Sequence, residues 1–454
     1  MNAGGSLPRQ VTVLGLGLFG GGAGAARYFA ERGVRVIAAD TRAPESLAET
    51  LEALKGLSIE YRLGRPHRAE DFAGSERVIV NPGVPPASPG FDLARAAGAR
   101  LDTEINLLFR LCPAPIAAIT GTNGKSTTVA LLGEMLRAAG RRTWVGGNLG
   151  GSLLPEVDRM RPEDIVVLEI SSFQAQRLPW SGVAPRLGAV LNITPDRHAD
   201  LAEYAEAKKE LLRGQGPLDF AILNSEDALL KGWAAVGRGT KFFFGATEDA
   251  AQGFRLEGET VALWRPGARA EVSLRGLKLP GRHNRFNASV AAVSAWLFGA
   301  PVGAIASAAR EFAGLPDRIE FVAEKGGVRY YNDSIATTPE STLAALEAFD
   351  TPLLVIAGGS SKKLSFEALG RRMAARARRV ILIGCTAPEI EAAIVSAGGP
   401  APLRAATLLE AVRAAAAAAR PGEAVLLSPA CASFDMFRNY AERGRCFRDA
   451  VRAL

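Results

Sequence analysis

The segment Ile116-Ala-Ala-Ile-Thr-Gly-Thr-Asn-Gly-Lys-Ser-Thr127 decides the fold of the middle of this chain. Its first four residues are apolar and follow a proline-rich stretch, which predicts a short buried strand. After Ser126, apolar residues recur at helical spacing until Gly140 supplies a stop, which predicts a helix. A glycine-rich loop that carries Lys125 between a strand and a helix is typical of a phosphate cradle. We therefore predict an ATP site, with Ser126 or Thr127 able to ligate Mg²⁺.

Composition narrows the class of protein. A chain of 454 residues has room for two to four domains, and no stretch approaches the roughly 18 apolar residues of a membrane span. The N-terminus lacks a basic stretch followed by an apolar run, and the four cysteines have no paired spacing. These features predict a cytoplasmic protein with free thiols. The formal charge of +7 is dispersed, which favours anionic small substrates over nucleic acid.

A second glycine-rich turn lies near the N-terminus. A predicted strand, Val11–Leu14, precedes Gly15-Leu-Gly-Leu-Phe-Gly20, and a second predicted strand, Val34–Ala39, ends in Asp40. This order predicts a Rossmann-type nucleotide site in which Asp40 contacts a ribose or base. A tight turn without a ligand is the simpler alternative, and the residues alone leave NAD as an open option.

Three further polar residues have both a functional and a simpler interpretation. Glu169 follows the predicted buried strand Asp164–Leu168. An Mg²⁺-binding carboxylate belongs at such a strand end beside a phosphate loop, and a surface ion pair is the alternative. His198 follows another predicted strand, but a solitary histidine is more often structural. Lys208 lies on a predicted helix, where the simpler interpretation is a solvated side chain.

The second half of the chain repeats the strand–helix alternation. The stretch Lys241–Leu274 alternates apolar and polar residues and predicts a small antiparallel appendage. Beyond a predicted hinge at Gly314–Glu320, four apolar strands separated by helical stretches predict another parallel sheet. The expected fold class is α/β with three domains, each built on a mainly parallel sheet.

With these residues assembled, the whole chain resembles the Mur ligase family, which builds the peptide stem of peptidoglycan. The resemblance is carried by motifs that are specific in combination: Gly121-Thr-Asn-Gly-Lys-Ser-Thr127, Gly146-Gly-Asn148, Glu169-Ile-Ser-Ser-Phe-Gln174, Gly281-Arg-His-Asn284, Leu315-Pro-Asp-Arg318, Asn332-Asp-Ser334 and Ser428-Pro-Ala-Cys-Ala-Ser-Phe-Asp435. It implies a Rossmann-like domain for a uridine nucleotide substrate (1–103), a P-loop ATPase-like ATP domain (104–314), and a Rossmann-like domain that binds the amino acid and closes over the site (315–454).

The resemblance also implies an activity and its participants. The expected reaction is ATP-dependent addition of D-glutamate to UDP-N-acetylmuramoyl-L-alanine through an acyl phosphate, with ATP and Mg²⁺ required. The expected enzyme is a cytoplasmic monomer that neither enters a membrane nor binds nucleic acid. Addition of L-glutamate is the nearest alternative. An NAD-dependent oxidoreductase would leave the second phosphate loop unexplained, and a non-catalytic nucleotide-binding protein could have lost Lys208 and Asp333.

The resemblance implies a set of binding residues for each ligand. The catalytic residues are Lys125, Glu169, Lys208 and His198. The ATP-binding residues are Gly121, Thr122, Asn123, Gly124, Lys125, Ser126, Thr127, Asn284, Asn287, Arg318 and Asp333. The residues for the uridine nucleotide substrate are Gly15, Leu16, Phe19, Asp40, Thr41, Arg42, Asn81, Gly83 and Asn148. The glutamate-binding residues are Thr337, Lys362, Ser433 and Tyr440. The Mg²⁺ ligands are Ser126, Glu169, His198 and Lys208, the last as a carbamate.

The chain departs from the family pattern at three places. The loop Pro195-Asp-Arg-His198 is shorter than usual, so His198 need not replace the usual metal-site histidine. Asp317 stands where a histidine often precedes the hinge arginine. Ile335 replaces a lysine that contacts glutamate, so another cation must bind the glutamate carboxylate if the D-enantiomer is the substrate.

Overall fold

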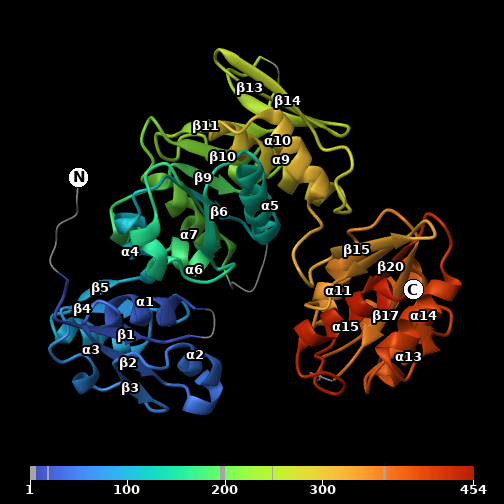
Figure 1. Cartoon of the computed structure of the whole chain (residues 1–454), viewed down its shortest axis with the longest axis horizontal. Helices are drawn as coiled ribbons and strands as arrows, with labels where there is room; N and C mark the ends of the chain where they lie inside the picture. The colour runs from blue at the N-terminus through green and yellow to red at the C-terminus, as the bar shows by residue number, and fades with distance from the viewer. Residues whose placement is uncertain (1–6, 18–19, 195–199, 248, 361–363) are drawn as a thin grey trace. The chain divides into compact units, whose positions relative to one another are not determined.

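The computed structural model describes residues 7–17, 20–194, 200–247, 249–360 and 364–454. The chain divides into two compact units. The first unit comprises residues 1–273 and 287–307, and the second comprises residues 274–286 and 308–454. Three sheets with flanking helices form the framework (Figure 1). The α/β class with three mainly parallel sheets is therefore confirmed.

The first sheet is parallel and has the strand order β3-β2-β1-β4-β5. Its strands are β1 (Gln10–Leu14), β2 (Arg35–Asp40), β3 (Ile59–Leu63), β4 (Arg77–Val80) and β5 (Arg100–Asp102). Its helices are α1 (Gly21–Ala30), α2 (Ala48–Ala53) and α3 (Pro89–Ala96). The next helix, α4 (Glu104–Leu111), packs against α1 and against the segments Leu154–Arg159 and Leu178–Ser181 of the central region. The loops that follow β1, β2 and β4 end at one edge of the sheet, because parallel strands bring their carboxyl ends together.

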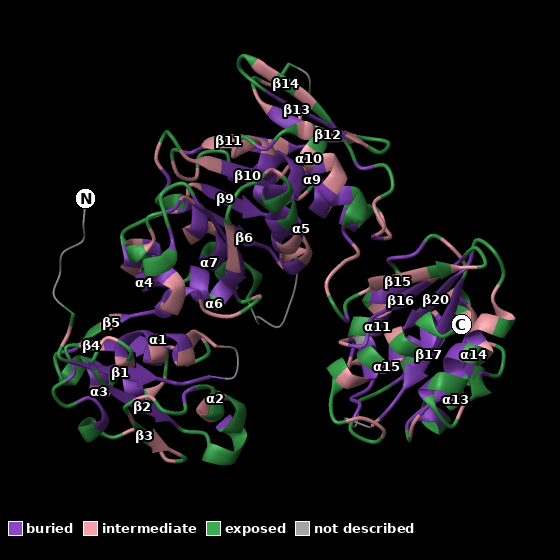
Figure 2. Ribbon diagram, viewed as in Figure 1, coloured by how far each residue is buried: buried purple, intermediate pink, exposed green. Residues whose placement is uncertain are grey.

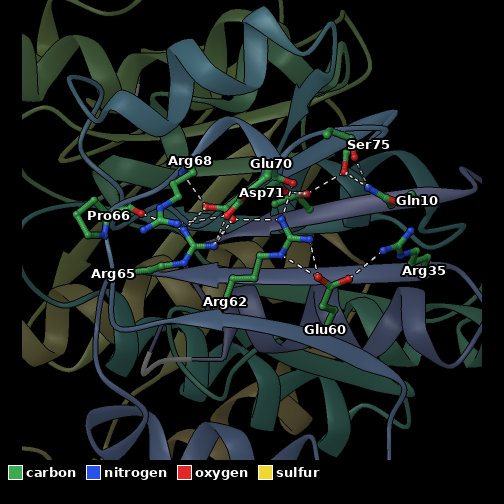
Figure 3. Close-up of polar contacts among 12 residues, drawn as sticks. Gln10, Arg35, Glu60, Arg62, Arg65, Pro66, Arg68, Glu70, Asp71 and Ser75 are labelled. Atoms are coloured by element: carbon green, nitrogen blue, oxygen red, sulfur yellow. Dashed lines mark hydrogen bonds and ion pairs between the residues drawn. The ribbon is translucent and has the colours of Figure 1, made fainter.

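An arginine network braces the outer edge of this sheet (Figure 3). The buried carboxylate of Asp71 accepts hydrogen bonds from Arg65 at 2.6 and 3.1 Å and from Arg62 at 3.3 Å. The backbone N–H of Arg68 also donates to this carboxylate, at 2.8 Å. The network holds the segment between β3 and the short 3₁₀ helix Ala69–Asp71, and thereby the position of His67.

The second sheet has nine strands in the order β14-β13-β12-β11-β10-β9-β6-β8-β7. The parallel strands are β6 (Ile116–Thr120), β7 (Thr143–Gly147), β8 (Ile165–Glu169), β9 (Leu187–Val190), β10 (Phe220–Asn224) and β11 (Thr240–Phe244). The antiparallel strands are β12 (Gly253–Glu257), β13 (Thr260–Arg265) and β14 (Ala268–Ser273). The predicted appendage is thus antiparallel only in part: β11 pairs in parallel with β10, and β12–β14 continue the same sheet.

The helices of the central region are α5 (Lys125–Ala138), α6 (Ser172–Ala175), α7 (Leu201–Arg213), α8 (Ala228–Lys231), α9 (Arg282–Leu297) and α10 (Val302–Glu311). The predicted strand before the phosphate loop is β6, and every residue of β6 is buried. The helix predicted after the loop is α5.

The third sheet has the order β15-β16-β20-β17-β18-β19, with only β15 antiparallel to its neighbour. Its strands are β15 (Glu320–Lys325), β16 (Val328–Asn332), β17 (Leu353–Gly358), β18 (Ala377–Ile383), β19 (Leu403–Arg404) and β20 (Ala424–Leu427). Its helices are α11 (Pro339–Leu346), α12 (Glu367–Arg376), α13 (Ala387–Ser396), α14 (Leu408–Ala418) and α15 (Tyr440–Arg452). The central strands are buried between helices, as Figure 2 shows for β17 and β20. None of the described helices combines the length and apolarity that a membrane span requires.

Candidate active site

A cavity of about 940 Å³ opens within the first unit, where loops of the first and second sheets meet. It brings together nine of the residues predicted from the sequence: Gly15, Asp40, Thr41, Arg42, Asn81, Gly83, Lys125, Asn148 and Lys208. The predicted residues Phe19, His198 and Lys362 lie outside the described part of the chain. The cavity therefore joins the two glycine-rich loops, which the sequence places about 100 residues apart.

The phosphate loop between β6 and α5 has the geometry of an anion cradle. Gly124 caps α5 in the left-handed region at φ 85°, and a Cβ there would lie 2.3 Å from Oδ1 of Asn287. Glycine is therefore required at this position, and Asn287 lies beside the loop. Asn192 holds the loop open from the opposite side, since its backbone carbonyl accepts from the N–H of Thr122 and its side chain accepts from the N–H of Asn123.

Two lysines converge on one backbone carbonyl of this loop. Nζ of Lys125 donates to the carbonyls of Gly121 at 3.0 Å and Thr122 at 2.8 Å. Nζ of Lys208 donates to the same Gly121 carbonyl at 3.0 Å and lies 4.3 Å from the ring centroid of Tyr204. Lys208 is only 1% exposed, so its interpretation as a solvated helix lysine is wrong. The side chains of Lys125 and Lys208 thus reach the phosphate loop from two different helices, α5 and α7.

Glu169 fits the role of a metal ligand. It ends β8, is buried, and its Oε1 accepts from Nδ2 of Asn148 at 2.8 Å. Its other oxygen, Oε2, has no hydrogen-bond partner among the described residues. A buried carboxylate oxygen without a partner is costly unless a cation or water satisfies it. The described residues contain no cluster of three or more His, Cys, Asp or Glu side chains, so other ligands would have to complete the shell.

Asp40 holds the first glycine-rich loop in place. Its Oδ2 accepts from the backbone N–H of Leu16 at 2.9 Å, and its Oδ1 accepts from the N–H of Arg42 at 2.9 Å. The carboxylate also pairs with the guanidinium of Arg42 at 3.2 Å. Gly17, at φ 74°, passes so close to Asn81 that a Cβ would lie 2.3 Å from its Nδ2. Asp40 thus shapes the loop in addition to lining the cavity.

The remaining predicted residues of the C-terminal part gather at one edge of the third sheet. Oδ2 of Asp333 accepts from the hydroxyl of Ser428 at 2.7 Å, and burial raises the pKa of Asp333 to about 7. The hydroxyl of Ser334 donates to the backbone carbonyl of Tyr440 at 2.8 Å. Ser433 is buried in the loop that Ser428 begins. Asn284 and Thr337 also belong to this unit.

The backbone around Arg318 is strained. Its neighbours Asp317 and Ile319 have φ values of 61° and 43°, which are unusual outside glycine. Asp317 is held by Nη1 of Arg448 at 2.9 Å and by Nδ2 of Asn332 at 2.8 Å. Asp317 therefore has a specific ion-pair partner, Arg448, in this chain.

Sequence reasoning missed several residues of the cavity or its wall, of which three carry an imidazole, carboxyl or guanidinium group. His67 and Glu104 line the cavity, and Arg177 donates to the backbone behind it. Burial lowers the pKa of His67 below its ordinary value, which favours the neutral imidazole. No local motif marks these residues. Glu104 in particular resembles any acidic residue in the first turn of a helix.

Glu104 is a buried acid at the base of the cavity. Its Oε1 lies 2.5 Å from the hydroxyl of Ser152, and burial raises its pKa to about 7 from an ordinary value of 4.5. Below pH 4.5 the carboxyl group is protonated in both the folded and unfolded states. As the pH rises toward 7, only the unfolded state releases the proton, so the free energy of unfolding falls, by roughly 3 kcal/mol in total.

We expect Glu104→Gln to remove this pH dependence. Urea unfolding at pH 5 and pH 8 should show the variant close to the wild type at pH 5 and more stable than the wild type at pH 8. The exposed Glu163→Gln serves as the matched control and should change neither value. An equal effect of Glu104→Gln at both pH values would contradict the raised pKa.

Three family descriptions cover most of the chain. Residues 9–102 match the N-terminal domain of MurD-like Mur ligases, residues 119–295 match the Mur ligase middle domain, and residues 317–431 match the glutamate ligase domain of Mur ligases. Curated relatives match over the full length. A UDP-N-acetylmuramoylalanine--D-glutamate ligase of Symbiobacterium thermophilum is 40% identical and both chains are covered completely. The corresponding ligase of a Roseiflexus species is also 40% identical, with 98% of this chain and 99% of the relative covered.

Solved structures share the fold at lower identity. The UDP-N-acetylmuramate-alanine ligase of Thermotoga maritima superposes with a TM-score of 0.58 and 19% identity, over 98% of this chain and 99% of that one. A UDP-N-acetylmuramoyl-L-alanyl-D-glutamate--2,6-diaminopimelate ligase superposes with a TM-score of 0.59 and 18% identity, over 93% and 94% of the two chains. The likeness supports the three-sheet architecture.

Proposed function

The chain belongs to the Mur ligase family, and we propose that it joins D-glutamate to UDP-N-acetylmuramoyl-L-alanine at the expense of ATP, as a step of peptidoglycan synthesis. The observation that carries the proposal is the shared cavity, in which the nucleotide-type loop of the first sheet faces Lys125 and Lys208 of the phosphate loop region. The D-enantiomer follows the names of the curated relatives. The oxidoreductase alternative gives no role to the two lysines.

The proposed reaction has two steps. The carboxylate of the alanyl substrate attacks the γ-phosphorus of ATP, giving an acyl phosphate and ADP. The amine of glutamate then attacks the acyl carbon, and the tetrahedral intermediate releases inorganic phosphate. Negative charge gathers where these groups meet, so the ammonium of Lys125 and the N–H groups at the start of α5 would stabilise it.

Mg²⁺ would be held by the hydroxyl of Ser126, the open oxygen of Glu169 and the carbamate of Lys208. When bound, it would neutralise charge on the phosphates. Gly121, Thr122, Asn123, Gly124 and Thr127 would contact the phosphates of ATP from the loop, and Asn284, Asn287, Arg318 and Asp333 would bind the rest of the nucleotide. The role of His198 as an Mg²⁺ ligand stays a prediction, because this residue lies outside the described part of the chain.

The two other substrates would take the remaining predicted residues. The uridine nucleotide would lie against Gly15, Leu16, Asp40, Thr41, Arg42, Asn81, Gly83 and Asn148. A contact with Phe19 stays a prediction, because Phe19 lies outside the described part of the chain. Glutamate would bind to Thr337, Ser433 and Tyr440, with Lys362 as the cation that compensates for Ile335. The proposed functional domains are residues 1–103, 104–314 and 315–454.

Phosphate release tests the proposal directly. The purified full-length chain with ATP, Mg²⁺ and UDP-N-acetylmuramoyl-L-alanine should release phosphate when D-glutamate is added, and only slowly with L-glutamate. Mass spectrometry of the nucleotide product should show the mass of one added glutamyl residue. Faster turnover of L-glutamate would overturn the stereochemical assignment, and absence of turnover with either enantiomer would overturn the ligase assignment.

A further inference from the structure

Arg177 is a buried cation whose ligands are backbone carbonyls. It lies eight residues after Glu169, just beyond α6, and is only 5% exposed. Its Nη1 donates to the carbonyl of Asn81 at 3.0 Å, and its Nη2 donates to the carbonyl of Val84 at 2.7 Å. No ion pair of the described residues includes Arg177, and burial alone lowers its pKa to about 10. A guanidinium buried without a carboxylate is costly, so its position calls for a reason beyond stability.

The guanidinium is fixed from several directions. Its carbon lies 5.5 Å from the ring centroid of Phe91 in α3. The backbone carbonyl of Arg177 accepts from Nδ2 of Asn106 in α4 at 2.7 Å, and its N–H donates to the carbonyl of Gln174 at 3.1 Å. The backbone of Arg177 is thus anchored to α4 and α6, and the two amino groups of its side chain are aimed at the loop after β4.

That loop is a wall of the cavity. Asn81, Gly83 and Val84 line it, and the Asn81 side chain packs against Gly17. The side chain also closes its own loop, because Oδ1 of Asn81 accepts from the N–H of Gly83 at 3.0 Å. The loop contains a glycine between two prolines, Pro82 and Pro85, and contributes no strand or helix of its own. The N–H of Asn81 ties the start of the loop to the carbonyl of Leu14 in β1 at 2.9 Å, and the carbonyls of Asn81 and Val84 are tied to Arg177.

We infer that Arg177 is a positioning residue for the uridine nucleotide substrate: it fixes the loop Asn81–Val84 against the segment that carries Glu169 and Gln174, so that the substrate wall and the phosphate-loop region form one rigid pocket. The inference rests on the proposed function, which makes this wall a substrate site. Two carbonyls at this spacing require the forked donors of arginine, because a lysine ammonium is a single point charge.

The inference predicts a selective loss of substrate binding. In Arg177→Ala, the affinity of the full-length protein for UDP-N-acetylmuramoyl-L-alanine, measured by isothermal titration, should fall at least about tenfold, while the affinity for ATP analogues should change less than about twofold. In turnover, KM for the uridine substrate should rise by the same factor with a smaller change in kcat. Arg177→Lys should resemble Arg177→Ala, because one point charge cannot bind both carbonyls.

Chemical rescue separates positioning from simple stability. Millimolar guanidinium chloride, far below denaturing concentrations, should enter the space left in Arg177→Ala and restore part of the substrate affinity, whereas sodium chloride of equal ionic strength should not. Arg177→Gln retains more of the side-chain packing, and it replaces Arg177→Ala in these measurements if Arg177→Ala does not fold. It should show the same selective loss, in a milder form.

Arg110→Met is the matched control. Arg110 also donates to a backbone carbonyl of the neighbouring segment, that of Trp180 at 3.4 Å. Unlike Arg177, it also pairs with a buried carboxylate, that of Asp102, and no hydrogen bond or ion pair among the described residues joins it to the loop Asn81–Val84. It should lower the melting temperature without a selective change in substrate affinity. Equal losses of uridine-substrate and ATP affinity in Arg177→Ala, or the same selective loss in Arg110→Met, would overturn the inference while leaving wild-type ligase activity, and hence the proposed function, intact.

Discussion

Lys125→Ala is expected to lose at least 10²- to 10³-fold in kcat, the loss seen when one preorganised electrostatic group is removed from a reacting centre. Nζ of Lys125 lies at the mouth of the phosphate loop, 2.8 Å from the carbonyl of Thr122 and beside the start of α5. The ammonium group of Lys125 can move from the carbonyl of Thr122 to a phosphoryl group as negative charge develops on that group. The measurement is phosphate release under saturating substrates.

The fold should survive this substitution, because Lys125 is half-buried at a helix N-terminus and is not one of the buried hydrophobic core residues. The melting temperature should therefore stay within a few degrees of the wild-type value. Lys55→Ala, at an exposed lysine paired with Glu52, is the control for the loss of one surface charge. Near-normal phosphate release by Lys125→Ala would remove the phosphate-loop assignment.

Apolar runs and glycine-rich turns in the sequence predicted the architecture, because the secondary structure that each of them favours is the one found in the fold. The apolar run Ile116–Ile119 forms β6, and the glycines that follow it have the backbone angles that a phosphate loop requires. The strands at Val328–Tyr331 and Ala424–Leu427 lie side by side as β16 and β20, although about 90 residues separate them. Polar residues at strand ends gathered at sheet edges because parallel strands place their carboxyl ends together.

Long-range contacts explain what the sequence did not reveal. Arg177 and Glu104 have no motif around them, and their importance comes from burial against residues that are about 50 to 95 positions away. The extension of the central sheet by β12–β14 depends on a single parallel pair, Phe244 with Phe254, which alternation alone cannot predict. Asp40 was expected at a ribose or base, and its additional role in shaping the loop depends on backbone N–H groups brought close only in the fold.

Lys208→Ala is expected to be nearly inactive, with a loss of similar size to that of Lys125→Ala. The side chain of Lys208 is 1% exposed, and its Nζ donates to Oγ1 of Thr120 at 3.2 Å and to the carbonyl of Gly121 at 3.0 Å. A carbamate at Nζ would place an anionic group at the base of the phosphate loop, where it would add to the carboxylate of Glu169 in holding Mg²⁺. Alanine would remove that group and leave a cavity.

Rescue by a small anion tests the carbamate specifically. Formate or acetate should enter the space left in Lys208→Ala and restore part of the phosphate release, whereas methylammonium, which replaces only the cation, should not. Lys209→Ala is the matched control on the next position of α7, because Lys209 pairs with Glu206 at 2.8 Å on the more exposed side of the helix. It should keep near-normal turnover. Restoration by methylammonium and not by the anions would show that Lys208 acts as an ammonium, and full activity of Lys208→Ala would remove it from the site altogether.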